Sequence, residues 1–120
     1  MNAFYTPTLV VDVRPGMPLF DEEVFGPVAP IIVARDTDDA ISLASQTKFG
    51  LGVSLFTNDL NKAQEIVSDF KDGAVFINEL VKSDPRLPFG GTGRSGFGRE
   101  LAIHGIREFV NIKTVYVRKF

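Results

Sequence analysis

Short apolar runs alternate along the chain with stretches whose apolar residues recur at helical spacing. An apolar run with few polar residues predicts a strand, and steps of three or four between apolar positions predict a helix. The predicted strands are residues 8–13, 28–34, 50–57 and 74–77. The run at 28–34 is apolar throughout, as expected for a strand covered on both faces. This alternation predicts an α/β fold.

Residues that favour helix ends mark two helices. Asp36 can accept a hydrogen bond at the start of the first, which extends toward Gly50. Asn58 or Asp59 begins the second, and Gly73 follows its end. The second helix carries one apolar stripe, formed by Leu60, Ala63, Val67 and Phe70. Both helices fall between predicted strands, as an α/β fold requires.

The last forty residues follow a less regular pattern. Residues 81–98 form a loop rich in proline and glycine, and loops of this length inside compact domains are often functional. The pattern at residues 101–109 predicts one or two short helices broken near Gly105. Residues 112–117 predict a closing strand.

Composition indicates a folded, water-soluble protein of one domain at most. The chain has 120 residues, of which 44% are apolar and 23% charged, so we expect a sizeable core. Its net charge of −2 comes from interleaved acids and bases, which disfavours nucleic acid and anionic membranes as partners. The longest apolar run is too short to cross a bilayer, and no secretory signal is visible, so we expect a cytoplasmic protein.

The chain contains no cysteine and one histidine, His104. The absence of cysteine excludes disulfides, thiolate metal sites and a cysteine nucleophile within these residues. A single histidine makes a histidine metal site or a Ser-His triad hard to assemble. We therefore expect no metal site, no cysteine nucleophile and no Ser-His triad among these residues.

Glu23 and Phe25 form a candidate site for a nicotinamide coenzyme. A carboxylate can accept hydrogen bonds from both hydroxyls of a vicinal diol, such as that of a ribose. A phenylalanine two residues further on presents an apolar face that could pack beside a nicotinamide ring. From the pattern alone, a surface charge and a core ring are the more common interpretation.

Two longer segments contain these and other candidate residues: Glu23-Val24-Phe25-Gly26-Pro27 and Pro88-Phe89-Gly90-Gly91-Thr92-Gly93-Arg94-Ser95-Gly96-Phe97-Gly98-Arg99-Glu100. Both resemble the C-terminal part of the NAD(P)-dependent aldehyde dehydrogenases, and the likeness runs from about Phe4 to Val117. The resemblance implies part of a Rossmann-like catalytic domain at residues 1–111 and an oligomerisation strand with its tail at residues 112–120.

The resemblance also implies roles for single residues. Glu23 would bind the nicotinamide ribose of NAD or NADP, and Phe25 would lie near the nicotinamide. Phe89 would line the aldehyde channel. The segment Ser83-Asp84-Pro85-Arg86-Leu87 is similar to a loop of succinate-semialdehyde dehydrogenases. By that likeness Ser83 would hold the far carboxylate of the substrate with Arg86 as a helper, although both residues also suit a turn on the surface.

Two features of the glycine-rich segment have simpler interpretations. Residues 91–96 fit the dinucleotide fingerprint G-x-G-x-x-G, but no strand is predicted directly before them, as that fingerprint requires. We expect these glycines to serve tight turns and close approach of the backbone instead. Arg99 and Glu100 indicate a structural ion pair or charges at a helix start.

In the family that the chain resembles, the cysteine nucleophile and the glutamate base lie upstream of the matched region. The resemblance therefore implies that this chain alone neither oxidises aldehydes nor binds NAD(P) tightly. Its partners would be the missing N-terminal part of the enzyme and further copies of itself, joined through the C-terminal strand. The alternatives are a non-enzymatic oligomerising or binding module and a compact enzyme of different chemistry, which the missing nucleophile, base and metal ligands disfavour.

Overall fold

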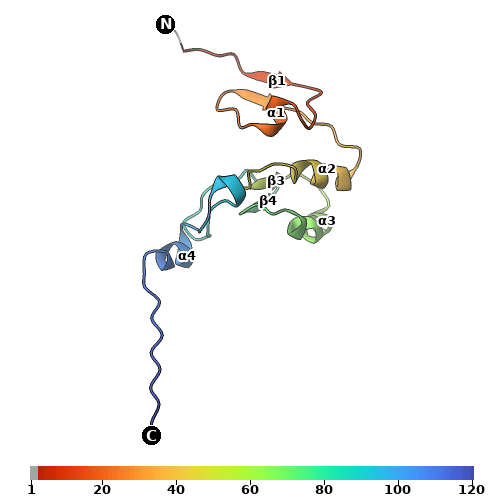
Figure 1. Ribbon diagram of the computed structural model, residues 1–120. Coiled ribbons are helices and arrows are strands. Elements are labelled where there is room, and N and C mark those ends of the chain that lie inside the picture. Colours follow the sequence, from red (N-terminus) through yellow and green to blue (C-terminus); the bar gives the residue numbers. More distant parts are fainter. Residues whose placement is uncertain (1–2) are drawn as a thin grey trace. The chain divides into compact units, whose positions relative to one another are not determined.

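The computed structural model describes residues 3–120 and divides the chain into two compact units, Met1–Lys48 and Phe49–Phe120 (Figure 1). Each unit contains one pair of parallel strands with helical residues in the connection between them. This arrangement confirms the α/β interpretation of the alternating pattern. A domain boundary between residues 111 and 112 stays a prediction.

The first unit is built on the strands β1 (Thr8–Val10) and β2 (Val28–Pro30). They pair in parallel, with Thr8 opposite Val28 and Val10 opposite Pro30. Backbone hydrogen bonds from Thr8 N to Pro27 O (2.8 Å) and from Ile31 N to Val10 O (2.8 Å) flank this register. Both strands are shorter than predicted, since the paired residues end at Val10 and Pro30.

Two helices complete the first unit. The connection between β1 and β2 contains α1 (Pro18–Asp21), a single turn that the sequence pattern did not predict and that begins with a proline. α2 (Thr37–Ala44) follows β2. The Asp36 side chain accepts a hydrogen bond from Asp39 N at 2.8 Å, so the predicted cap is confirmed.

The second unit begins with a strand–helix–strand segment. Its elements are β3 (Val53–Leu55), α3 (Leu60–Glu65), the 3₁₀ turn η1 (Ile66–Asp69) and β4 (Val75–Ile77). β3 and β4 pair in parallel, with Val53 opposite Val75. Of the two predicted cap residues, Asp59 is the one used, because its side chain accepts from Lys62 N at 2.9 Å. Ala63 and Phe70 of the predicted stripe are buried.

The glycine-rich segment contains the 3₁₀ turn η2 (Gly93–Ser95), and α4 (Ala102–Arg107) follows it. The predicted break near Gly105 is wrong, since Gly105 lies inside α4 and is buried. A Cβ atom there would be only 2.9 Å from the carbonyl carbon of Glu100. The glycine therefore permits close approach of the helix to the preceding backbone and does not end the helix.

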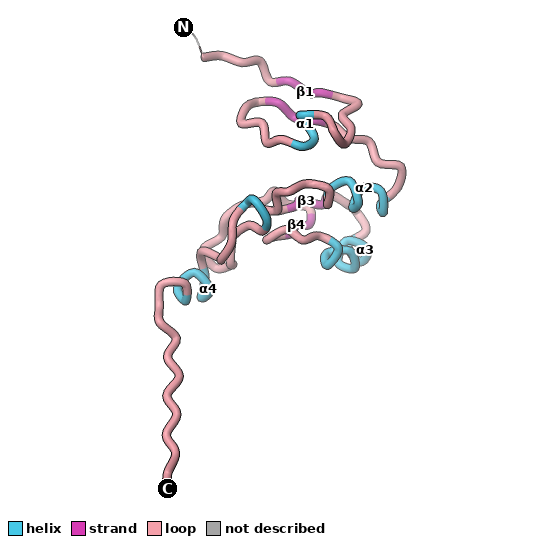
Figure 2. The backbone as a smooth tube through the Cα atoms, viewed as in Figure 1, coloured by secondary structure: helices cyan, strands magenta, loops and turns pink. Residues whose placement is uncertain are grey.

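Residues 111–120 carry neither helix nor strand and extend beyond α4 (Figure 2). A strand is stabilised by hydrogen bonds to a neighbouring strand, and among residues 3–120 no strand pairs with residues 112–117. The predicted closing strand is thus not observed in the isolated chain, and it stays a prediction for the chain in an assembly.

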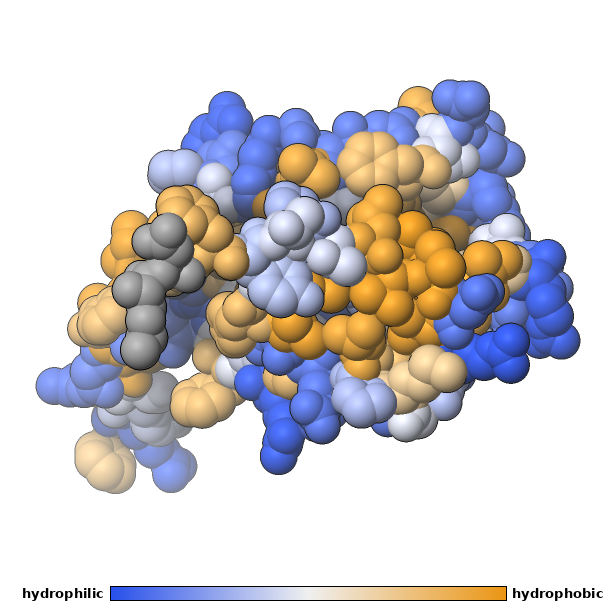
Figure 3. Space-filling view, turned by 90° about the horizontal axis from the view of Figure 1, so that it is seen from above, coloured by the Kyte–Doolittle hydropathy of each residue, from blue (hydrophilic) through white to orange (hydrophobic). Residues whose placement is uncertain are grey.

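The prediction of a sizeable core is wrong for the chain by itself. Among residues 3–120, only Val13, Ala63 and Phe70 are buried apolar residues. Val33, from the run expected to be covered on both faces, is 80% exposed. Figure 3 shows apolar side chains gathered on the face in view, with polar ones around them. A pair of strands with one short crossover has too few neighbours to cover both faces of its sheet.

The structure provides no candidate for a membrane span. The longest helix within residues 3–120 is α2, with eight residues, and no described helix reaches the length and apolarity that crossing a bilayer requires.

Candidate functional site

Glu23 and Phe25 lie in the first unit, in the connection from α1 to β2. Two tight turns shape this connection, with hydrogen bonds from Gly26 N to Val24 O (3.0 Å) and from Val28 N to Gly26 O (2.8 Å). Each bond spans two residues, so Phe25 is the central residue of the first turn. A side chain at such a corner points away from the turn, and the Phe25 ring is 93% exposed.

The chemistry of these two side chains suits the predicted coenzyme. Glu23 is exposed, and its carboxylate makes no hydrogen bond or ion pair with the residues that the structure describes. Both of its oxygens therefore remain able to accept from a diol. Covering a ring such as that of Phe25 is worth about 2 kcal/mol. The pair thus offers an acceptor beside an apolar surface.

Ser83 and Arg86 lie in the second unit, in the loop after β4. Arg86 is held by Asp84, which accepts from its backbone N (2.9 Å), its Nε (2.9 Å) and its Nη2 (2.6 Å). The Arg86 guanidinium lowers the pKa of the Asp84 carboxyl well below its usual range, chiefly through the side-chain hydrogen bonds. The Arg86 guanidinium is therefore already committed to a carboxylate of the chain.

Ser83 differs from Arg86 in this respect. Its side chain is exposed, and its hydroxyl forms no hydrogen bond with residues 3–120. Of the two residues predicted to hold a substrate carboxylate, the serine is the one whose side chain has no partner among the described residues.

Phe89 marks the entrance to the glycine-rich loop. Its backbone N donates to Glu100 O at 2.9 Å, and Glu100 N donates to Phe89 O at 2.7 Å. These reciprocal bonds form an isolated antiparallel bridge across the two ends of the loop. The half-buried Phe89 side chain lines two hollows, one against β4 and one within the glycine-rich loop. The structure thus brings Phe89 to a cavity wall, as the aldehyde-channel prediction requires.

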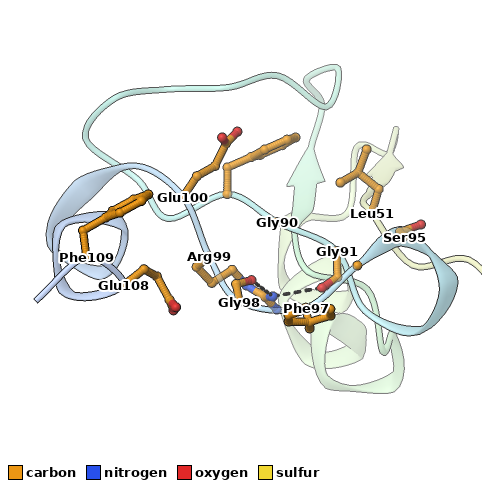
Figure 4. A pocket seen from close by; sticks show the side chains of 12 residues that line it. Leu51, Gly90, Gly91, Ser95, Phe97, Gly98, Arg99, Glu100, Glu108 and Phe109 are labelled. Atoms are coloured by element: carbon orange, nitrogen blue, oxygen red, sulfur yellow. Dashed lines mark hydrogen bonds between the residues drawn. The ribbon is translucent and has the colours of Figure 1, made fainter. Parts of the chain in front are cut away.

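The hollow within the glycine-rich loop has a volume of about 400 Å³ (Figure 4). Glu108 and Phe109 from the end of α4 lie on one side, Leu51 lies on the other, and Arg99 reaches between them. The second hollow, also about 400 Å³, is lined by β4 and by side chains of the following loop, among them Lys82 and Asp84. Ser83 lines neither of the hollows that Phe89 lines.

The glycine-rich segment does not form a dinucleotide fingerprint. Residues 78–88 contain no strand, and α4 begins only at Ala102, six residues after Gly96. The interpretation of the five glycines within residues 90–98 as turn and packing residues is confirmed at Gly90. A Cβ atom there would be 2.7 Å from Gly98 O and 3.1 Å from the Cδ atom of Arg99.

Arg99 has partners that the sequence pattern did not reveal. Of the two alternatives, an ion pair with Glu100 is absent among the described residues, and Arg99 Nη1 donates to the carbonyl oxygens of Gly91 (3.0 Å) and Gly98 (2.7 Å). The other alternative, charges at a helix start, stays a prediction for residues that lie just before α4. The sequence signal was available in principle, since a run of glycines presents backbone acceptors that no side chain shields. Which of these carbonyl oxygens Arg99 reaches, however, depends on how the loop closes.

Residues 92–95 of the same loop are hydrogen-bonded to the backbone of Gly50, shortly before β3 begins. Thr92 N donates to Gly50 O at 2.9 Å, and Thr92 Oγ1 donates to Lys71 O at 2.9 Å. Gly50 N donates to Ser95 Oγ at 3.0 Å. Thr92 and Ser95 thus fix residues 92–95 against the strand pair, a role that the sequence analysis missed.

Residues 3–120 contain no group of three or more histidine, cysteine or carboxylate side chains that could hold a metal ion. His104 is exposed on α4. The described residues therefore provide two separate features: hollows lined by Phe89 in the second unit, and an exposed carboxylate with an exposed ring in the first.

Comparison with known proteins gives these features a context. Residues 1–115 match the aldehyde dehydrogenase family. Over 114 residues the chain is 53% identical to a protein of Mycobacterium ulcerans named succinate-semialdehyde dehydrogenase [NADP(+)] 1, a match that covers 95% of this chain and 25% of that protein. The chain spans about a quarter of the length of the curated relatives that it matches.

Solved structures agree with this match. The betaine aldehyde dehydrogenase of Staphylococcus aureus in complex with NAD+ is 36% identical, with a TM-score of 0.85 over 88% of this chain and 21% of that one. An aldehyde dehydrogenase of Mycobacterium tuberculosis complexed with NAD+ is 39% identical, with a TM-score of 0.83 over 88% of this chain and 22% of that one.

Proposed function

Because this chain belongs to the aldehyde dehydrogenase family, we propose that it serves as the C-terminal part of an NAD(P)-dependent oxidoreductase that converts an aldehyde to the acid. The observation that carries this proposal is the 53% identity to a succinate-semialdehyde dehydrogenase over nearly the whole chain. Succinate semialdehyde is accordingly the substrate that we propose, and the cytoplasm is the compartment.

Glu23 and Phe25 form the coenzyme contact in this proposal. The unpaired Glu23 carboxylate accepts hydrogen bonds from the nicotinamide ribose, and the exposed Phe25 ring covers one side of the nicotinamide. The bound coenzyme, NAD or NADP, supplies hydride acceptance. The fit is supported by two side chains whose binding surfaces no described residue occupies.

Ser83 and Phe89 form the substrate contact. The available Ser83 hydroxyl donates to the far carboxylate of succinate semialdehyde, while Phe89 lines the path of its carbon chain. Arg86 has a lesser part, because its guanidinium already forms two hydrogen bonds with Asp84. This division of roles refines the sequence prediction, which placed both residues on the carboxylate.

The chain requires further polypeptide to act. It contains no cysteine to serve as nucleophile, so we infer that it is catalytically incompetent alone and functions with the preceding part of the enzyme. Apolar side chains that lie open in the isolated chain, such as Leu9 and Val33, supply the surface that this part covers.

A second partner is a further copy of the enzyme. The segment 112–117 carries the exposed apolar residues Ile112, Val115 and Val117, and its backbone has no strand partner among residues 3–120. An extended segment of this kind pairs readily with the edge of another sheet. We therefore place the homo-oligomer contact at this C-terminal segment.

A chimera tests the proposal. The chain is joined to the part of the M. ulcerans enzyme that precedes the matched region, and reduction of NADP+ by the chimera is followed with succinate semialdehyde as substrate. The chimera is expected to turn over, and the 120-residue chain alone is not. Turnover by the chain alone would contradict its proposed incompetence. An inactive chimera beside an active parent enzyme would contradict the proposed function and favour a non-enzymatic oligomerising module.

A further inference from the structure

We propose that Arg99 is a positioning residue, which closes the glycine-rich loop at residues 90–98 and thereby sets the place of Phe89. The relevance to substrate rests on the proposed function, in which Phe89 lines the aldehyde path. The closure itself rests only on the contacts of Arg99.

Arg99 joins two points of the loop that are distant along the backbone. Its Nη1 atom donates to Gly91 O at 3.0 Å and to Gly98 O at 2.7 Å, and both bonds are drawn in Figure 4. Among residues 3–120, no other donor reaches either carbonyl oxygen. The Arg99 side chain is half-buried, and its bond to Gly91 O is part-buried, so that bond competes less with water than one made by an exposed arginine.

The outer part of the loop has little else to hold it. Residues 92–95 are fastened to Gly50, but Phe97 is fully exposed, and Gly96 and Gly98 have positive φ angles. Glycine loses more conformational freedom on ordering than any other residue. A donor that fixes Gly98 to Gly91 therefore restricts the most flexible portion of the loop.

Phe89 is coupled to this closure through its neighbour Gly90. A Cβ atom on Gly90 would lie 2.7 Å from Gly98 O and 3.1 Å from the Cδ atom of Arg99, so the Arg99 side chain packs directly on that residue. At the far end of the loop, Arg99 directly precedes Glu100. The backbone of Glu100 forms both hydrogen bonds of the bridge to Phe89. Arg99 thus touches the segments on both sides of the bridge.

The role is that of a hydrogen-bond donor to backbone and not of an ion-pair partner. The acids near Arg99 are Glu100 and Glu108, which line the same hollow, and neither forms a salt bridge with it within residues 3–120. Glutamine keeps a donor without the reach or the charge of the guanidinium, and lysine keeps the charge without the planar fork. The two substitutions therefore separate charge from geometry.

Amide hydrogen exchange of the 120-residue chain tests the closure without any activity. Arg99→Gln is expected to speed exchange at the Phe89 and Glu100 amides about tenfold. The amides of Val53 and Asn78, which donate across the β3–β4 pair, report whether the unit remains folded. Arg94→Gln is the matched control, because Arg94 lies in the same loop and its side chain makes no hydrogen bond or ion pair with the described residues.

Unchanged exchange at both bridge amides in Arg99→Gln would overturn the proposal, as would unprotected bridge amides in the unaltered chain. Faster exchange at Val53 and Asn78 would show that Arg99→Gln unfolds the unit. The same measurement on Arg99→Lys would then decide whether Arg99 closes the loop. In that case, Arg99→Lys is expected to speed exchange at the bridge amides alone, and exchange equal to that of the unaltered chain would overturn the proposal.

A double-mutant cycle in the chimera tests whether Arg99 acts through Phe89. Arg99→Gln is expected to raise KM for the aldehyde about tenfold and to leave KM for the coenzyme unchanged. Phe89→Ala should remove this effect, so that the double variant is no worse than Phe89→Ala alone. Independent effects of the two substitutions would overturn the positioning role. An inactive chimera would refute the proposed function while leaving the exchange result to decide the closure.

Discussion

Asn78 binds the backbone of Thr57 through both ends of its side-chain amide. Its Oδ1 atom accepts from Thr57 N and its Nδ2 atom donates to Thr57 O, each at 2.8 Å. Asn78 N also donates to Leu55 O, the last residue of β3, so the backbone pairing continues one residue past the end of β4. Asn78 has a φ of 55°, a conformation that asparagine tolerates better than most residues.

This arrangement predicts a difference between two substitutions of Asn78. Asn78→Gly keeps the backbone conformation but loses both side-chain bonds, and is expected to lower the free energy of unfolding by about 1–2 kcal/mol. Asn78→Asp replaces the Nδ2 donor with a second oxygen, which faces the acceptor Thr57 O. It is therefore expected to lower the free energy of unfolding by more than Asn78→Gly near neutral pH, where the carboxyl is ionised. Urea unfolding measures both, and equal stability of all three proteins would contradict the bidentate role.

Gly73 and Gly26 are expected to differ sharply in their tolerance of alanine. A Cβ atom on Gly73 would collide with the carbonyl group of Gly90, which is backbone and moves only with its whole segment, whereas nothing lies within 4 Å of the same atom on Gly26. Gly73→Ala is expected to cost about 2 kcal/mol or more, and Gly26→Ala close to nothing. Thermal unfolding of the two variants makes the comparison, and similar losses would contradict the close approach of Gly73 to Gly90.

Asp39 is expected to titrate well below an ordinary aspartate. Hydrogen bonds from the Arg35 side chain and backbone lower the pKa of Asp39 from 3.8 to about 2. Because the pKa is lowered in the folded state, the stabilisation from this pair is complete above pH 4 and is lost as the pH falls through about 2.

An NMR titration of the Asp39 carboxyl measures this value. Arg35→Gln should raise the pKa toward its ordinary value, and Arg14→Gln should leave it unchanged, since the Arg14 side chain forms no ion pair within residues 3–120. If Arg35→Gln leaves the pKa of Asp39 unchanged, Arg35 is not the cause of its lowering.

Ser83 and Arg86 are expected to contribute unequally to substrate binding in the chimera. Ser83→Ala should raise KM for succinate semialdehyde about tenfold, since a hydrogen bond to a charged group is lost. Arg86→Gln should change it little, because Arg86 is engaged by Asp84. An aldehyde without a far carboxylate is the control substrate, and an equal effect of Ser83→Ala on both aldehydes would refute the carboxylate contact.

Glu23 is expected to act on the coenzyme alone. Glu23→Gln in the chimera should raise KM for NADP+ about tenfold and leave KM for the aldehyde unchanged, because the charge-assisted part of the ribose contact is lost. Glu22→Gln is the matched control. The Glu22 carboxylate is adjacent in the sequence, is also exposed, and forms no ion pair among the described residues. A shift in the aldehyde KM alone would place Glu23 at another contact.

Some features of the structure followed from short sequence spacings. The caps formed by Asp36 and Asp59 depend only on residues three positions further on, so local chemistry was sufficient to predict them. The closing strand predicted at residues 112–117 is not decided by local chemistry in the same way, because strand pairing requires a partner, and none is present within residues 3–120.

For the candidate site as well, the sequence selected the residues, and the structure added their contacts and exposure. Ser83 and Phe89 were selected by resemblance alone, and the structure adds that Phe89 faces two hollows while Arg86 is engaged by Asp84. Glu23 and Phe25 were selected by their motif, and the structure adds that both side chains are exposed.

The sequence by itself determined the alternating α/β pattern, the helix starts and the lack of a cysteine nucleophile, since these depend on composition and on neighbours along the chain. Only the tertiary structure decided that Arg99 binds carbonyl groups and not an acid, that Gly105 lies inside a helix, and that few apolar residues are buried. These outcomes depend on which backbone and side-chain groups meet when the chain closes on itself, and spacing along the sequence does not specify those encounters.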